Sequence, residues 1–221
     1  MWAKHHVLVV TRIFTPQSEA LSDNDLKYSY IVLNTLDGFA FYNSDATAGS
    51  SQHHKHLQLI PYKSLSTPYL SKILQLVDGA SASSQTKADP LGLLVLDFPF
   101  FEPYKHILVK FREFQPYTQD LDKYAAYLQQ VYQRCRERVG CASIDHSFNL
   151  AFGKNWMLMV LRKKEKVAGG ISVNGLGCLG SICVTNRQKF DRLKMMHPSE
   201  FYSEILVHKN DNFEYLVASD I

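Results

Sequence analysis

The chain is poor in cysteine. Only Cys135, Cys141, Cys178 and Cys183 occur among its 221 residues, and no two of them form a Cys-x-x-Cys pair. Disulfide-dependent secreted domains and cysteine-based zinc sites carry more cysteines at closer spacing. The cysteine content therefore predicts reduced thiols in a cytoplasmic protein and gives no support to a disulfide framework.

A long hydrophobic segment is also missing. The apolar stretch from Gly92 to Phe101 contains Asp97 and Pro99, so it does not read as a membrane span. The apolar run near the N-terminus is short, follows two histidines and precedes no small-residue cleavage site, which makes a poor signal peptide. No membrane association is predicted.

Neither sign of charge is in large excess. The chain has 24 Lys and Arg residues against 21 Asp and Glu residues, a formal net charge of +3. This excess is too small to indicate a nucleic-acid partner. It is compatible with a small anionic substrate whose site holds a local cluster of cations.

The hydrophobic pattern mixes strands and helices without regular strand–helix alternation. We expect strands where apolar and β-branched residues are dense, and helices where apolar residues recur every three to four positions. The expected strands are 6–14, 39–42, 56–62, 106–111, 148–153 and 156–162, and the expected helices are 22–38, 67–77, 120–139 and a short one after 198. The fold class is α+β, with a largely antiparallel sheet and flanking helices.

We expect residues 1–221 to form a single domain, with its catalytic motif at 43–58. The C-terminal part starts near residue 90, after a small and polar segment at 79–89 that is typical of a flexible linker.

The most informative segment is the run from Asn43 to Gln58, NSDATAGSSQHHKHLQ. Gly49 and the small residues around it can bring backbone N–H groups close to an anion. Ser50, Ser51 and Gln52 add side-chain donors. The segment therefore predicts a phosphate-binding loop that leads into a strand.

His54, His56 and Gln58 follow that loop at every second position, which puts their side chains on one face of the expected strand. A neutral imidazole can attack phosphorus when its other nitrogen donates a hydrogen bond to an orienting acceptor. An amide such as that of Gln58 can stabilise charge on a phosphate oxygen. The pattern favours nucleophilic catalysis on a phosphate.

Two other interpretations of the histidines stay open. Clustered histidines can bind zinc or copper, although no Asp, Glu or Cys lies beside them to complete a ligand set. They can also be purely structural. We expect no bound metal at the histidines.

The segment from Gly49 to Gln58, GSSQHHKHLQ, resembles the active-site motif of the diadenosine tetraphosphate phosphorylases, also called ATP adenylyltransferases, of the histidine-triad superfamily. Related uridylyltransferases also end this motif in glutamine. The resemblance extends to the strand and helix before Asn43, to the segment from Phe148 to Arg162 and to the segment from Ser172 to Gly180. It covers most of the chain.

The resemblance implies a two-step reaction in which His56 attacks a dinucleoside polyphosphate, ATP leaves and inorganic phosphate then releases ADP. It assigns His54 to ordering the site and places Asn43 near the substrate. Gln58 would hold phosphate oxygens, together with Gly49, Ser50, Ser51 and Gln52 of the loop. Lys154 is a further phosphate-binding candidate, with a solvated hairpin lysine as the alternative.

No cofactor is expected to bind tightly, although magnesium can accompany the polyphosphate. Two alternatives to phosphorolysis are hydrolysis, with water in the second step, and nucleotide binding without turnover. The resembling family has more chain before the strand that here begins near His6. Its loss would weaken base binding by roughly 10- to 100-fold, so we expect weak activity with little base preference.

Overall fold

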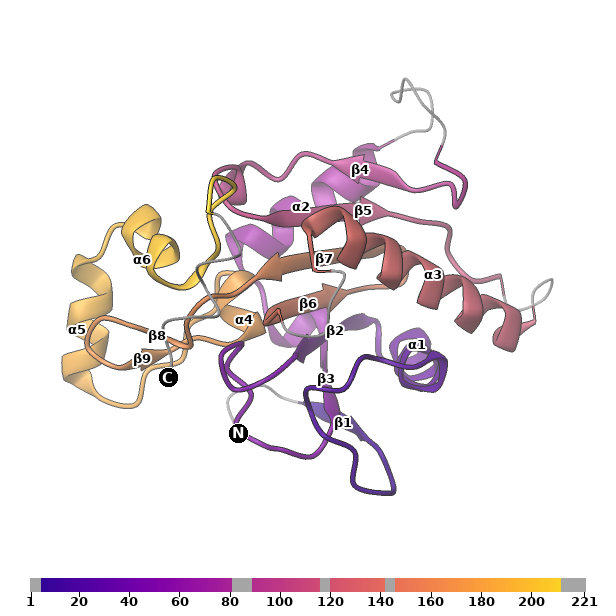
Figure 1. Ribbon diagram of the computed structural model, residues 1–221, viewed down its shortest axis with the longest axis horizontal. Helices are drawn as coiled ribbons and strands as arrows, with labels where there is room; N and C mark the ends of the chain where they lie inside the picture. Colours follow the sequence, from indigo (N-terminus) through magenta and orange to yellow (C-terminus); the bar gives the residue numbers. More distant parts are fainter. Residues whose placement is uncertain (1–4, 81–88, 116–119, 142–145, 212–221) are drawn as a thin grey trace.

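A seven-stranded sheet forms the centre of the computed structural model, which describes residues 5–80, 89–115, 120–141 and 146–211 (Figure 1). Every neighbouring pair of its strands is antiparallel. Across the sheet the order is β1 (Val7–Val10), β3 (His56–Pro61), β2 (Gly38–Asn43), β6 (Phe148–Phe152), β7 (Trp156–Leu161), β5 (His106–Lys110) and β4 (Leu94–Leu96). The predicted α+β class with an antiparallel sheet is confirmed.

The first and second parts of the chain share this sheet through one strand pair. Strands β1 to β3 precede residue 62, and strands β4 to β7 follow residue 93. They meet where β2 pairs with β6, with Asn43 opposite Asn149. Because Asn43 is the first residue of the motif at 43–58, this strand pair brings the motif into contact with the C-terminal part.

Helices α1 (Asp23–Leu36) and α3 (Leu121–Val139) cover one face of the sheet (Figure 1). Alternate strand residues such as Leu57 and Leu59 pack beneath them. Helices α2 (Pro68–Gly79), α4 (Gly175–Cys178) and α6 (Pro198–Ile205) pack on the other face, which buries Ile60, Leu158 and Val160. The alternation of side chains along the strands thus separates two hydrophobic cores.

Local signals explain the ends of the two long helices. The Ser22 hydroxyl accepts a hydrogen bond from the Asp25 backbone, and the Asp25 carboxylate accepts one from the Ser22 backbone. Helix α3 starts after Asp120, which accepts from two backbone N–H groups, and ends at Gly140 in the left-handed conformation. Both predicted helices are confirmed to within about two residues.

Several elements differ from the sequence expectation. Strand β1 covers only part of the predicted 6–14, because the chain turns back after Thr11 and its residues 15–17 pair with 53–55. Strand β4, the helix α5 (Arg187–Met195) and the two-stranded sheet of β8 (Lys166–Val167) and β9 (Ile171–Ser172) were not predicted. Most of the predicted linker at 79–89 lies outside the described residues.

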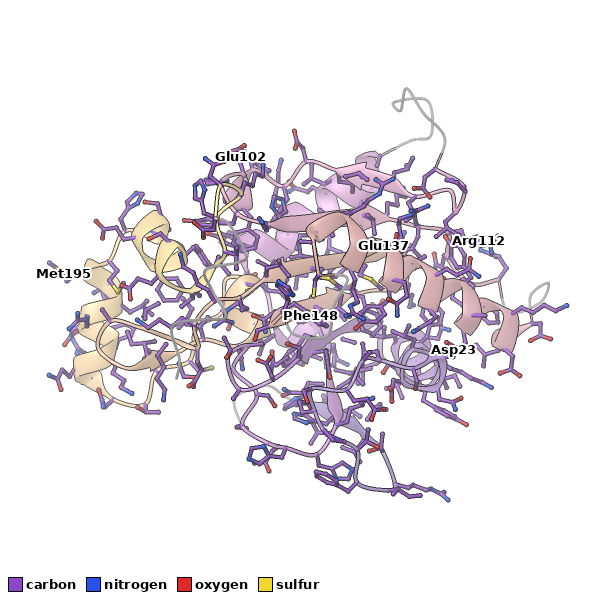
Figure 2. The ribbon with its side chains drawn as sticks, viewed as in Figure 1. Asp23, Glu102, Arg112, Glu137, Phe148 and Met195 are labelled. Atoms are coloured by element: carbon purple, nitrogen blue, oxygen red, sulfur yellow. The ribbon has the colours of Figure 1, made fainter. Side chains whose placement is uncertain are left out.

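Helix α5 has no fully buried residue, so the spacing of apolar residues in the sequence does not indicate it. Met195 at its end is exposed and lies at the opposite side of the molecule from Arg112 (Figure 2). Among the described helices, none is both long and apolar enough to cross a membrane.

Candidate active site

His56 is the first residue of β3, and its side chain is 9% exposed. Its ring Nδ1 lies 2.9 Å from the backbone oxygen of His54. A carbonyl oxygen can only accept, so Nδ1 carries the proton and donates it. In the neutral ring the lone pair is therefore on Nε2. This is the tautomer that nucleophilic attack through Nε2 requires.

The His54 ring is fixed by the loop that follows β1. Its Nε2 lies 2.8 Å from the Thr11 hydroxyl, and the Phe14 ring packs against it at a centroid distance of 5.5 Å. His54 pairs with Pro16 just before β3 begins. In this structure His54 therefore contacts His56 through its backbone oxygen, while its own side chain is held by Thr11.

Gln58 lies on the same face as His56, between Leu8 of β1 and Phe41 of β2. Its side chain hydrogen-bonds with His6, whose ring stacks on Phe41 at 6.4 Å. Burial is the main cause that lowers the pKa of His6; the nearby His56 also lowers it and Gln58 opposes this. Sequence reasoning missed His6, although its place two residues before Leu8 puts it on this face.

Asn43 is buried at the end of β2, where we expected a residue beside the substrate. Its Oδ1 accepts from Asn149 Nδ2 at 2.9 Å and from the Gly175 backbone at 2.8 Å. Asn149 also donates to the Ala48 backbone oxygen at 2.7 Å. Asn43 therefore joins the loop, β6 and the start of α4.

Arg162 completes this network from beneath the loop. Its guanidinium donates to the Asn149 side chain at 2.5 Å and to the backbone oxygens of Ala48, Lys164 and Glu165. It is 4% exposed, and desolvation lowers its pKa. The charged run 162–166 is typical of a solvated loop, but Arg162 is buried because it also bonds to Asn149 of β6 and to Ala48, which lies far earlier in the chain.

The loop from Asn43 to Gln52 is shaped by Asp45 and Gly49. The Asp45 carboxylate accepts from the Ala48 backbone at 2.9 Å, and its backbone oxygen accepts from Ser50. Gly49 has a φ of +86°, and a Cβ there would lie 2.4 Å from the Val173 backbone oxygen. Only glycine fits this close approach between the loop and the segment before α4.

Ser50, Ser51 and Gln52 lead from this turn toward His56. Ser51 and Gln52 are exposed, and the Ser50 hydroxyl donates to the Gln52 backbone oxygen at 3.0 Å. In the part of the chain that the structure describes, the backbone N–H groups of Ser51 and Gln52 have no protein acceptor. They are thus available to an anion, and their role as phosphate ligands stays a prediction.

The structure does not bring Lys154 to this site. Asn149 lies at the site end of β6, and Lys154 follows the far end of the same strand, about 16 Å away at the rise of a strand. Its ammonium lies 3.8 Å from the Asp37 carboxylate, at the other end of β2. The alternative interpretation, a hairpin lysine, fits this position.

No group of three or more His, Cys, Asp and Glu side chains is arranged to hold a metal ion within residues 5–80, 89–115, 120–141 and 146–211. The His54 ring bonds to a hydroxyl and the His56 Nδ1 to a carbonyl. These contacts orient imidazole rings without requiring a metal.

Two family models match the chain. The model described as "Ap4A phosphorylase N-terminal domain" matches residues 2–76, and the one described as "ATP adenylyltransferase C-terminal domain" matches residues 102–208. The chain belongs to the Ap4A phosphorylase and ATP adenylyltransferase family. Both the motif at 43–58 and the network around Asn149 lie inside the matched residues.

Relatives from yeast agree with this assignment. Diadenosine 5',5'''-P1,P4-tetraphosphate phosphorylase 2 of Saccharomyces cerevisiae is 27% identical over 85% of this chain and 61% of its own length. The crystal structure of yeast Ap4A phosphorylase Apa2 in complex with AMP has a TM-score of 0.67 at 25% identity, over 90% of this chain and 66% of that one. The complex of Apa2 with Ap4A gives 0.62 at 24%, over 86% and 64%. The chain thus spans less than two thirds of these relatives.

Proposed function

We propose that this protein cleaves dinucleoside polyphosphates, with diadenosine tetraphosphate as the leading substrate, by phosphorolysis through a nucleotidylated His56. One observation carries the proposal: the 2.9 Å contact that leaves the lone pair of His56 on Nε2. Family membership and the AMP and Ap4A complexes of yeast Apa2 support the substrate class.

In the first step, Nε2 of His56 attacks the α-phosphorus and the bond from that phosphorus to its bridging oxygen breaks. The electron pair of this bond leaves with ATP, and AMP remains bonded to Nε2. The ring then carries a positive charge while Nδ1 keeps its proton. The His54 carbonyl, aligned with that proton before reaction, stabilises this charge as it develops.

In the second step, an oxygen of inorganic phosphate attacks the same phosphorus. The bond to Nε2 breaks, its electron pair returns to the ring, and ADP leaves. Because Nδ1 holds its proton throughout, His56 returns to its starting tautomer without a separate proton transfer.

Gln58 is suited to stabilise charge on a non-bridging oxygen of the transferred phosphoryl group. A neutral imidazole carries one N–H, and a carboxamide has one accepting and one donating end. In this proposal the His6 ring donates its N–H to the oxygen of Gln58. The NH2 end of Gln58 is then left for the substrate.

The loop supplies further donors for the polyphosphate. The N–H groups of Ser51 and Gln52 and the hydroxyl of Ser51 lie just before His56 in the chain. No tightly bound cofactor takes part in this proposal; magnesium would arrive with the polyphosphate.

Product analysis tests the reaction. The purified protein is incubated with diadenosine tetraphosphate and inorganic phosphate, and nucleotides are separated chromatographically. Equal amounts of ATP and ADP that depend on phosphate support the proposal. ATP with AMP, formed without phosphate, would show hydrolysis instead. Saturable binding without any product would show a nucleotide-binding protein and contradict phosphorolysis.

A further inference from the structure

Gln17 is a buried polar residue in the turn between β1 and α1, and sequence reasoning did not single it out. Its side chain is 4% exposed. Its backbone N–H donates to the His53 oxygen at 2.8 Å, and its backbone oxygen accepts from the Tyr42 hydroxyl. The main chain of Gln17 is thus tied both to the strand that carries the histidines and to β2.

The Gln17 carboxamide bridges the ends of β2 and β3. Its Oε1 accepts from the His56 backbone N–H at 2.9 Å. Its Nε2 donates to the Asn43 backbone oxygen at 2.7 Å and to the His56 backbone oxygen at 3.3 Å. One amide therefore holds both backbone groups of His56 and one of Asn43.

The register of the two strands shows what this amide replaces. The pairing of β2 with β3 runs from Gly38 opposite Pro61 to Phe41 opposite Gln58, and its continuation would put Asn43 opposite His56. The Tyr62 N–H donates to the Asp37 oxygen, so Asp37 and Tyr62 form a hydrogen-bonded pair. In an antiparallel ladder every second pair is of this type, and the pair of Asn43 and His56 is one of them. A regular ladder would join His56 N–H to Asn43 C=O, and the Gln17 carboxamide takes both of these groups.

We propose that Gln17 is a positioning residue for His56, whose inserted amide separates β2 from β3 at the site and sets the place of the nucleophile. Only a side chain with a donor and an acceptor can satisfy both strands at once. A misplacement of about 1 Å in a reacting group can cost on the order of 100-fold in rate. The inference rests on the proposed function for its kinetic consequence, while its structural part is independent.

Gln17→Met tests the kinetic consequence because it has similar length and no polar end. We expect kcat to fall at least about tenfold while the Michaelis constant changes less than about threefold, as for loss of positioning rather than binding. Gln17→Glu keeps an acceptor for the His56 N–H but replaces the donor to the Asn43 oxygen by a second acceptor, so kcat should fall in this variant too. Tyr127→Phe is the matched control.

Tyr127 is buried on α3, and its hydroxyl donates to the Leu91 oxygen at 3.1 Å and accepts from the Arg112 N–H at 3.4 Å. Its loss should lower thermal stability with kcat unchanged. A Gln17→Met protein as stable as this control, with a kcat within about threefold of wild type, would overturn the proposal.

A measurement on the wild-type protein covers the case in which the variants do not fold or the protein turns over no substrate. In nuclear magnetic resonance spectra, the side-chain NH2 protons of Gln17 should exchange slowly with solvent and show a nuclear Overhauser effect to the His56 backbone N–H. Rapid exchange with no such effect would refute the inserted amide. Failure of phosphorolysis alone would leave this result unchanged, so the two proposals fail separately.

Discussion

Replacing Gly49 by alanine should displace the loop from Asn43 to Gln52. At a φ of +86° an alanine is strained, by about 1–2 kcal/mol. Its Cβ would also lie 2.4 Å from the Val173 oxygen and 2.8 Å from the Asn174 Cα. These are backbone atoms, so the segment before α4 must move, at a further cost of about 1–3 kcal/mol.

Gly92→Ala separates these two effects. Gly92 has a φ of +70°, and nothing lies within 4 Å of a Cβ built there. The backbone strain alone should therefore lower the stability of Gly92→Ala, and the turnover of this variant should equal that of the wild type. The free energy of unfolding of Gly49→Ala should fall by about 2–5 kcal/mol in total, and the displaced loop should lower kcat/KM by roughly 10- to 100-fold.

Thermal unfolding and steady-state phosphorolysis of the two variants provide the assay. For a chain of this size a loss of 1 kcal/mol lowers Tm by about 2–4 °C. Equal Tm values for the two variants, with full activity in Gly49→Ala, would refute the close approach of the loop to Val173 as a determinant of the site.

Three further changes probe other parts of the account. Gln58→Ala should lower kcat by ~100-fold with little effect on the Michaelis constant. A change in the Michaelis constant alone would show that Gln58 does not stabilise the transition state. Asn149→Ala should cost about 2–4 kcal/mol in urea unfolding, since it removes one hydrogen bond each from the buried side chains of Arg162 and Asn43, and wild-type stability would contradict this. Burial is the main cause that lowers the pKa of His106 from 6.5, so the unfolded chain binds a proton there first as pH falls. The free energy of unfolding should decrease below pH 6.5 and decrease less in His106→Phe; equal pH dependence in both proteins would contradict the shift.

The sequence predicts the elements whose signals are local. A capping side chain and an apolar repeat lie within one segment for helices α1 and α3, and a dense apolar run of five or six residues marks each of β2, β3, β6 and β7. These signals reflect propensities that the fold does not override. Helix α5 has no fully buried residue, and its apolar residues Phe190, Leu193 and Met195 are too few to mark a helix face in the sequence.

The residues that sequence reasoning missed in the site depend on contacts between distant segments. Gln17 meets His56 across 39 positions, and the carbonyl role of His54 appears only when both residues are placed. Arg162 opens a charged run, 162–166, that is typical of a surface loop, and its partner Ala48 lies 114 positions earlier. Lys154 looked like a candidate because the register that puts it at the far end of β6 was unknown.

The most direct test of a covalent His56 intermediate is the intact mass of the protein after incubation with diadenosine tetraphosphate in the absence of phosphate. We expect a gain of one AMP residue, release of ATP, and loss of the adduct as ADP when phosphate is added. A His56→Ala protein should gain nothing while remaining folded. An adduct that persists in His56→Ala, or turnover by the wild type without any adduct, would contradict the account.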